Sequence, residues 1–128
     1  MTDLPRPAEF ELAILRVIWR RGEATVRQIY EDLQSERQLG YTTVLKTMQI
    51  MHEKGLLTRD ESDRSHVYRT ALPESETQAG MLKDLLQKVF GGSTRKLVMA
   101  ALKEAPMAPE EEAEIKALLE QGRKRVHK

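Results

Sequence analysis

The segment from Gly40 to Leu57 combines an apolar stripe with a polar face that could hydrogen-bond to the edges of DNA bases. At about 100° per residue, Val44, Met48 and Met51 fall on one side of a helix over this segment. The opposite side carries Thr42, Lys46, Gln49, Ile50 and Glu53, with Thr43 beside them. The candidates for base contact are Thr42, Thr43, Lys46, Gln49 and Ile50. Lysine can contact guanine O6 and N7, glutamine can pair with adenine, and threonine and isoleucine can meet thymine methyls. We predict base contacts from this face, and an ordinary amphipathic core helix is the alternative.

A short predicted hairpin with basic residues follows directly. Residues 56–59 and 66–70 have an extended pattern, and the turn-rich residues 60–65 lie between them. The basic residues that flank or tip this hairpin are Arg59, Arg64, His66 and Arg69. They could hold phosphates or enter a minor groove, with Arg64 as the first choice for a backbone contact. Three acidic residues of the same turn cancel much of this charge, so a merely solvated hairpin is the alternative.

Other chemistry is excluded or unsupported. The chain has no cysteine, which rules out disulfides, thiolate catalysis and cysteine-based metal sites. His52, His66 and His127 have no partner at metal-ligand spacing. Neither a nucleophile–base pair nor a glycine-rich phosphate loop is present. We predict no catalytic residue, no cofactor and no metal site, and therefore a protein that is not an enzyme.

Composition favours a helical protein whose net charge is too small to attract DNA by itself. The 128 residues are 40% hydrophobic, 32% charged and 5% aromatic. Residues 1–72 carry 11 Lys and Arg against 11 Asp and Glu, and residues 73–128 carry 10 against 9, which gives the net charge of +1. Any contact with DNA must come from a local patch.

The first half of the chain predicts three helices followed by the hairpin. The first helix covers residues 7–21 and stops at Gly22, and the second begins after Thr25 as its N-cap. The third covers residues 42–54, and Gly55 ends it in a left-handed conformation. This is the order of a winged helix-turn-helix, in which the third helix is the recognition helix and the hairpin is the wing.

After Pro73 the pattern is helical to the end. We expect one helix over residues 75–90, a second capped by Ser93, and a last one that begins at Glu110 and ends near Gly122. Isolated helices of this length are marginal in water, so we expect them to pack against the same helices of a second chain. The residues predicted to form that contact are Leu82, Leu85, Leu86, Val89, Leu97, Val98, Leu102, Ile115, Leu118 and Leu119.

These patterns predict a mostly α fold with a small β-hairpin, divided into two regions. Residues 1–72 form a winged-helix DNA-binding domain, and residues 73–128 form a helical dimerisation region. No run approaches the ~20 apolar residues of a membrane span. The N-terminal segment also lacks the apolar core of a signal peptide. We therefore expect no membrane insertion and a cytoplasmic protein.

Several short motifs, in this order and spacing, resemble the penicillinase-repressor family of winged-helix regulators. They are Glu9-Phe10-Glu11-Leu12, Val17-Ile18-Trp19, Tyr41-Thr42-Thr43-Val44 with Thr47, Lys54-Gly55-Leu56-Leu57, Arg64 with Tyr68, Lys88-Val89-Phe90-Gly91-Gly92 and Lys96-Leu97-Val98. The resemblance covers nearly the whole chain. It implies a homodimer that binds a palindromic double-stranded DNA operator through its N-terminal domains and represses the genes beneath it.

The resemblance also implies a route of release. Some members are inactivated by proteolysis of an Asn–Phe bond in the dimerisation arm, which makes a membrane sensor and protease system a candidate partner. The aligned residues here are Ala100-Ala101, which depart from that pattern. Copper-responsive members carry a cysteine-rich C-terminal motif that this chain lacks. The near-zero charge of residues 1–72 keeps one alternative open, a winged-helix module that binds another protein instead of DNA.

Overall fold

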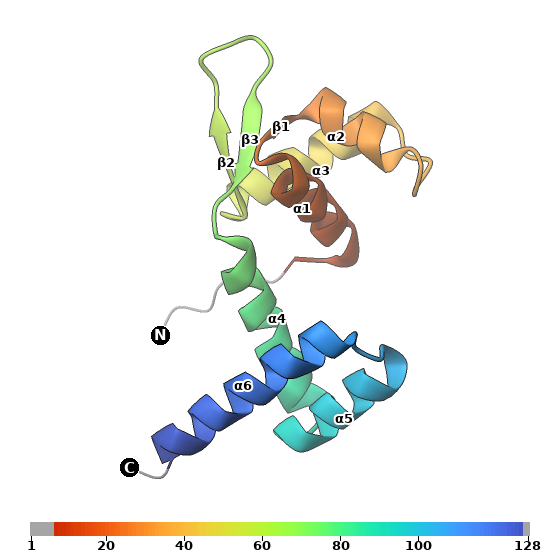
Figure 1. The fold of residues 1–128 in the computed structure, drawn as a ribbon. Coiled ribbons are helices and arrows are strands. Elements are labelled where there is room, and N and C mark those ends of the chain that lie inside the picture. The colour runs from red at the N-terminus through yellow and green to blue at the C-terminus, as the bar shows by residue number, and fades with distance from the viewer. Residues whose placement is uncertain (1–6, 127–128) are drawn as a thin grey trace. The chain divides into compact units, whose positions relative to one another are not determined.

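The computed structural model describes residues 7–126, with side chains described through residue 123. The chain folds into two compact units, one ending at Lys83 and the other beginning at Asp84. Figure 1 shows the helices and the three-stranded sheet along the chain. The predicted fold class, a mostly helical winged helix with a hairpin, is confirmed. Within the described residues, no helix has the length and apolar character needed to cross a membrane.

The three helices predicted for the first half of the chain are present. They are α1 (Glu9–Arg21), α2 (Val26–Leu33) and α3 (Tyr41–Glu53). Thr25 caps α2 as predicted, because its Oγ1 accepts a hydrogen bond from the backbone N–H of Gln28 at 3.2 Å. Gly55 has φ 86°, the left-handed conformation that ends α3 and that other residues adopt only at a cost.

The sheet has one strand more than the predicted hairpin. Its strands are β1 (Ala24–Thr25), β2 (Leu57–Asp60) and β3 (Val67–Thr70). The order is β1-β3-β2, and both pairings are antiparallel. The hairpin of β2 and β3 is confirmed, whereas β1 was not predicted because two residues are too short to display an alternating pattern. Tyr68 of the central strand is only 1% exposed and packs in the core.

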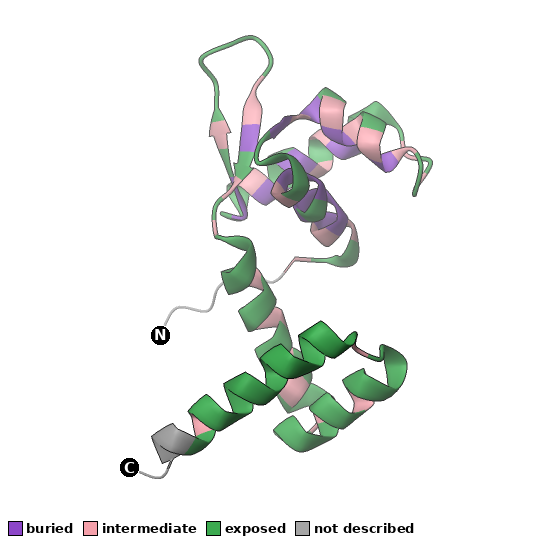
Figure 2. Ribbon diagram, viewed as in Figure 1, coloured by how far each residue is buried: buried purple, intermediate pink, exposed green. Residues whose placement is uncertain are grey.

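The core lies between the three helices and the sheet, and α3 supplies its best-buried stripe. Val44, Met48 and Met51 are all 0% exposed, as their helical spacing predicted. They belong to one cluster with buried residues of α1 and α2, including Ile14 and Ile29. Figure 2 shows this burial confined to the N-terminal helices and the base of the sheet. Each such side chain contributes about 1.5–3 kcal/mol, so the stripe fixes how α3 is rotated.

A buried carboxylate ties the start of α1 to the end of α3. Glu11 is 6% exposed, and its Oε2 accepts a hydrogen bond from Lys54 Nζ at 2.8 Å. Its Oε1 accepts the backbone N–H of Ala8 at 2.9 Å. Burial raises the pKa of Glu11, but the bonds from Lys54 and Ala8 outweigh it, so the pKa lies below its usual value. This ion pair therefore favours one position of α3 against α1.

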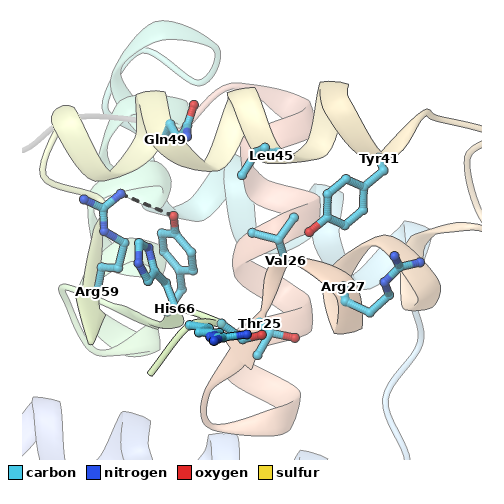
Figure 3. Close-up of a pocket in the computed structure, with 11 residues that line it drawn as sticks. Thr25, Val26, Arg27, Tyr41, Leu45, Gln49, Arg59 and His66 are labelled. Atoms are coloured by element: carbon cyan, nitrogen blue, oxygen red, sulfur yellow. Dashed lines mark hydrogen bonds between the residues drawn. The ribbon is translucent and has the colours of Figure 1, made fainter. Parts of the chain in front are cut away.

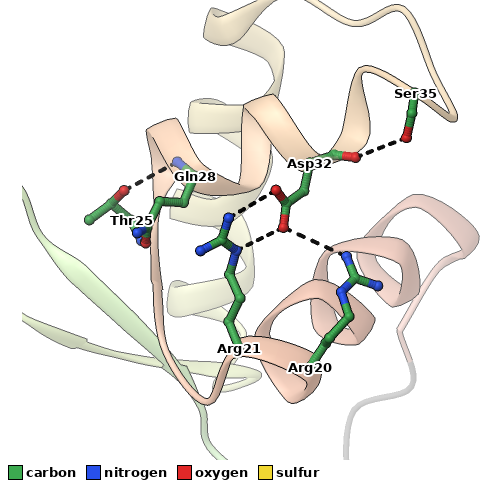
Figure 4. A network of polar contacts seen from close by, with 6 residues as sticks. All are labelled: Arg20, Arg21, Thr25, Gln28, Asp32 and Ser35. Atoms are coloured by element: carbon green, nitrogen blue, oxygen red, sulfur yellow. Dashed lines mark hydrogen bonds and ion pairs between the residues drawn. The ribbon is translucent and has the colours of Figure 1, made fainter.

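A second charged contact joins α1 to α2 (Figure 4). The Arg21 guanidinium donates from Nε to Asp32 Oδ2 at 2.7 Å and from Nη2 to Oδ1 at 2.9 Å. Arg20 adds a longer contact of 3.6 Å to the same carboxylate. These arginines hold the pKa of Asp32 below its usual range. The pair anchors α2 close to the turn that leads out of α1.

The second half of the chain is helical, as predicted. Its helices are α4 (Glu74–Lys88), α5 (Thr94–Glu104) and α6 (Pro109–Val126). Ser93 caps α5 by accepting the N–H of Lys96 at 3.2 Å. The predicted end of the last helix near Gly122 is wrong, because α6 continues to Val126. A glycine inside a helix costs only about 1 kcal/mol, and the good helix formers around it outweigh that cost.

Replacing Glu11 with glutamine tests the buried ion pair. We expect Glu11→Gln to lower the free energy of unfolding at neutral pH by about 1.5–3 kcal/mol, the range for hydrogen bonds to charged groups. The native pKa of Glu11 lies below its ordinary value of 4.5. Its contribution is therefore complete above that pH and is lost as the pH falls through the native pKa. The difference between wild type and variant should shrink in acid.

Urea unfolding followed by the fluorescence of Trp19, the only tryptophan, measures this difference between about pH 7 and pH 3. Glu36→Gln, at an exposed position, is the matched control and should change little at any pH. A loss of stability in Glu11→Gln that is the same at every pH would contradict the prediction.

Candidate nucleic-acid interface

The face of α3 predicted to contact bases is uncovered, and we call it the recognition face. Its five residues are all exposed, and they are Thr42, Thr43, Lys46, Gln49 and Ile50. The exposed fraction of Ile50 is 44%. Among the residues that the structure describes, the side chains of Lys46 and Gln49 have no hydrogen-bond or ion-pair partner. The recognition face therefore presents donors, acceptors and methyl groups directly to solvent, and its contacts with bases stay a prediction.

Thr47 follows Lys46 in α3, but its hydroxyl bonds within the helix. Its hydroxyl donates to the backbone carbonyl of Thr43 at 2.8 Å, so its hydrogen is turned back onto the helix. The side chain of Thr43 itself stays exposed. Thr42 and Thr43 lie in the first turn of α3, the end that a recognition helix places against base edges.

Arg59 of the wing is occupied by neighbours within the chain. Its Nε donates to Glu61 Oε2 at 2.9 Å, and its Nη1 makes a long contact of 3.5 Å to the Tyr68 hydroxyl. These bonds raise the pKa of Arg59 and lower that of Glu61. Arg59 and Tyr68 are cross-strand partners, so the guanidinium lies over the buried ring. Arg59 therefore braces the wing, with less of its charge free for a phosphate.

Arg69 lies on the other face of the sheet. Successive residues of a strand point to opposite faces, so Arg69 points away from the side of Tyr68. Its guanidinium pairs with Glu23, with Nε donating to Oε1 at 2.9 Å. The structure thus separates Arg69 from the other cations of the wing. Arg64 is exposed and His66 half-buried, and both lie on the side of α3.

A groove with a volume of about 300 Å³ runs between α2, α3 and the wing. It is lined by Thr25, Val26, Arg27, Tyr41, Leu45, Gln49, Arg59, Arg64, Ser65, His66 and Tyr68. Figure 3 shows Tyr41, Leu45 and Gln49 along α3, with Arg27 at one end and Arg59 and His66 at the other. Gln49 belongs to both the groove and the recognition face, so the two surfaces are continuous.

Arg27 and Tyr41 were not among the predicted site residues. The guanidinium carbon of Arg27 lies 5.0 Å from the ring centroid of Tyr41 and 5.9 Å from that of Tyr30. The two rings meet edge to face, with centroids 5.6 Å apart. This arrangement joins α2 to the start of α3. The sequence offers no signal for it beyond a basic residue beside the N-cap Thr25.

The assembled surface offers groups that suit binding. It offers an unpaired amine, an amide, guanidinium groups and methyl groups, and no carboxylate lines the groove. Within the described part of the chain, no three His, Cys, Asp or Glu side chains gather as a metal site. His127, weighed as a metal ligand from the sequence, lies outside the described residues. The chemistry available is hydrogen bonding to bases and attraction of phosphate.

The apolar residues predicted for dimerisation are largely uncovered. The exposed members are Leu82, Leu85, Val89, Val98, Leu102, Ile115, Leu118 and Leu119, and the half-buried ones are Leu86 and Leu97. Met99, which the prediction omitted, is 47% exposed. No described residue of α4, α5 or α6 is buried. These helices thus leave their apolar side chains in water within a single chain.

The sequence matches known proteins over most of its length. The family model of the penicillinase repressor matches residues 7–121. The protein named transcriptional regulator BlaI of Mycobacterium tuberculosis is 33% identical over 121 residues, which are 94% of this chain and 88% of the relative. The methicillin resistance regulatory protein MecI of Staphylococcus aureus is 22% identical over 112 residues, covering 88% of this chain and 89% of the relative.

A solved structure shares the fold of the N-terminal unit. The Bacillus licheniformis BlaI monomeric form, solved in complex with the blaP half-operator, aligns with a TM-score of 0.51 and 22% identity. The alignment covers 59% of this chain and 93% of that chain. This similarity supports the winged-helix fold described above.

Proposed function

The chain belongs to the penicillinase-repressor family, and from this premise we propose that it is a sequence-specific, DNA-binding transcriptional repressor. The family consists of repressors and not of enzymes, and the Mycobacterium tuberculosis relative is named a transcriptional regulator. We propose that the protein binds a palindromic double-stranded DNA operator as a homodimer, with α3 in the major groove and the wing against the backbone.

The observation that carries this proposal is the uncovered recognition face. Packing of Val44, Met48 and Met51 turns α3 so that Lys46 and Gln49 face solvent without partners among the described residues. Burying polar groups against another surface is costly unless each finds a hydrogen-bond partner. Base edges in the major groove supply such partners at the required spacing. An apolar protein surface would leave them unsatisfied.

Dimerisation is proposed for the helical region, residues 73–128. The exposed leucines and valines of α4 to α6 form no core of their own, and helices of this length are marginal alone. Cover by the same helices of a second chain would remove that apolar surface from water. Residues 1–72 would then act as the DNA-binding domain. A two-fold dimer places its half-sites about one helical turn apart, or a multiple of it.

Release from the operator is proposed to depend on a partner system. A membrane sensor and protease is the family's candidate. Ala100 and Ala101 lie inside α5 and depart from the family's Asn–Phe cleavage pattern. We therefore assign no cleavage to this bond.

A binding titration at physiological salt tests the proposed function. The purified protein should prefer its own promoter over random duplex by at least ~10³-fold. Affinity should also fall steeply as salt rises, because phosphate contacts release counterions. Absence of any preference, with binding to a protein that is insensitive to salt, would favour the interaction-module alternative instead.

Removal of one amine from the recognition face tests the role of α3. If Lys46 contacts a base, Lys46→Ala should cost about 1–3 kcal/mol of operator binding, concentrated at one base-pair position. Titration against operators substituted at each position measures this directly. Arg16→Ala removes another exposed charge, from α1, and should leave the same titrations unchanged. An equal effect of the two substitutions would contradict the assignment.

Truncation after Leu72 tests the proposed division of labour. Every residue described as buried lies between Glu11 and Tyr68, so we expect the truncated protein to stay folded. It should be monomeric and bind the operator poorly, because two linked half-site contacts become one. Sedimentation measures the mass, and Trp19 fluorescence reports folding. A truncated protein that still sediments as a dimer would place the interface elsewhere.

A further inference from the structure

The cations of the N-terminal unit divide into paired and unpaired groups. Six of its described Lys and Arg residues form ion pairs: Arg20, Arg21, Arg37, Lys54, Arg59 and Arg69. Among the described residues up to Thr70, four others form none: Arg16, Arg27, Lys46 and Arg64. One of these is on the recognition face, and Arg27 and Arg64 line the groove beside it. The free positive charge is thus concentrated on one side of a nearly neutral unit.

Arg27 is held in place without being neutralised. Its guanidinium lies 5.0 Å from the Tyr41 ring centroid and 5.9 Å from that of Tyr30. Such contacts orient a guanidinium through the negative face of the ring and leave its N–H groups free. A carboxylate partner would instead occupy those donors. Arg27 therefore keeps a full charge and a restricted position, two properties that favour binding of an anion.

The groove is continuous with the recognition face through Gln49. DNA whose base edges meet this side of α3 must run its sugar–phosphate backbone along the flanks of the helix. One flank is the groove, with Arg27 from α2 on one side and Arg64 from the wing among its lining residues. Among the residues that the structure describes, the only acidic side chain that contacts a cation lining the groove is Glu61, which Arg59 already holds.

We propose that this groove seats the DNA backbone, and that Arg27 binds a phosphate there while Arg64 holds the same strand from the wing. The proposal rests on the proposed function and adds α2 to the binding surface. A guanidinium matches a phosphate because its planar N–H groups bind two oxygens at once. Phosphate contacts fix the register and orientation of the protein and carry no sequence information directly. Arg27 therefore contributes affinity that is the same for every sequence.

Arg27→Gln tests this assignment in the full-length protein. It removes the charge and keeps a polar side chain of similar reach. Two lost contacts per dimer should reduce the slope of log affinity against log salt by about 1.8, which amounts to about 30-fold weaker binding near 0.15 M salt. Operator and random duplex should lose affinity by the same factor. Arg27→Lys should recover most of the slope, and Arg16→Gln is the control that should change neither quantity.

Operators in which one phosphate at a time is made neutral can identify the phosphate that Arg27 binds. Methylphosphonate linkages, introduced one at a time into the operator, remove single charges without changing the bases. At one position in each half-site, neutralisation should weaken binding of the wild type and have no further effect on Arg27→Gln. Coupling of this kind arises only when the side chain and the phosphate interact. Thermal unfolding of the variant, followed by Trp19 fluorescence, should stay close to that of the wild type, because an exposed cation–π contact contributes only about 0.5–1 kcal/mol.

The outcomes separate this inference from the proposed function. Arg27→Gln with unchanged affinity and salt slope would overturn the inference, while the wild type could still select its promoter. A loss confined to one operator sequence, with an unchanged slope, would also overturn it, because Arg27 would then act on a base. Equal losses on all duplexes, a lower slope and coupling to one phosphate would support it. Failure of the wild type to prefer its promoter would instead reject the proposed function.

Discussion

The packing of the apolar stripe of α3 is the constraint on which the rest of the structure depends. Val44, Met48 and Met51 are wholly buried, so α3 cannot rotate without exposing them. A rotation of half a turn would bury Lys46 and Gln49 without partners, which costs far more than thermal energy. The Glu11–Lys54 ion pair holds the end of the same helix against α1. The orientation of the recognition face is therefore a consequence of the core.

The protein has almost no net charge, and its charged side chains act through local pairs and patches. Residues 1–72 are formally neutral, and internal ion pairs such as Arg21–Asp32 and Arg69–Glu23 account for much of their charge. Of the unpaired cations in the described part of this region, Arg27, Lys46 and Arg64 lie on α3 or beside it, and Arg16 lies on α1. A weak overall field gives little non-specific attraction, since such attraction scales with the number of phosphates neutralised. If the protein acts as proposed, selectivity for an operator depends on few contacts, and the proposed dimer would double them.

Local signals in the sequence predicted most of the fold because each has a local physical cause. Thr25 predicted the start of α2 through its hydroxyl, and Gly55 predicted the end of α3 through its positive φ. Other features were missed for equally physical reasons. The strand β1 forms only because β3 offers it a partner, and two residues show no period. The predicted end of α6 near Gly122 is too early, because the helix-forming residues around this glycine carry the helix on to Val126.

The candidate site shows the same division between local and long-range information. Helical spacing alone separates Lys46 and Gln49 from the buried stripe, since the period of a helix is set by its backbone. Which cations accompany them depends on contacts between segments distant in sequence. Arg59 and Arg69 look alike in the chain, yet the alternation of the paired strands sends them to opposite faces of the sheet. Arg27 joins Tyr41 only because α2 packs on α3, a contact between residues that no sequence period relates.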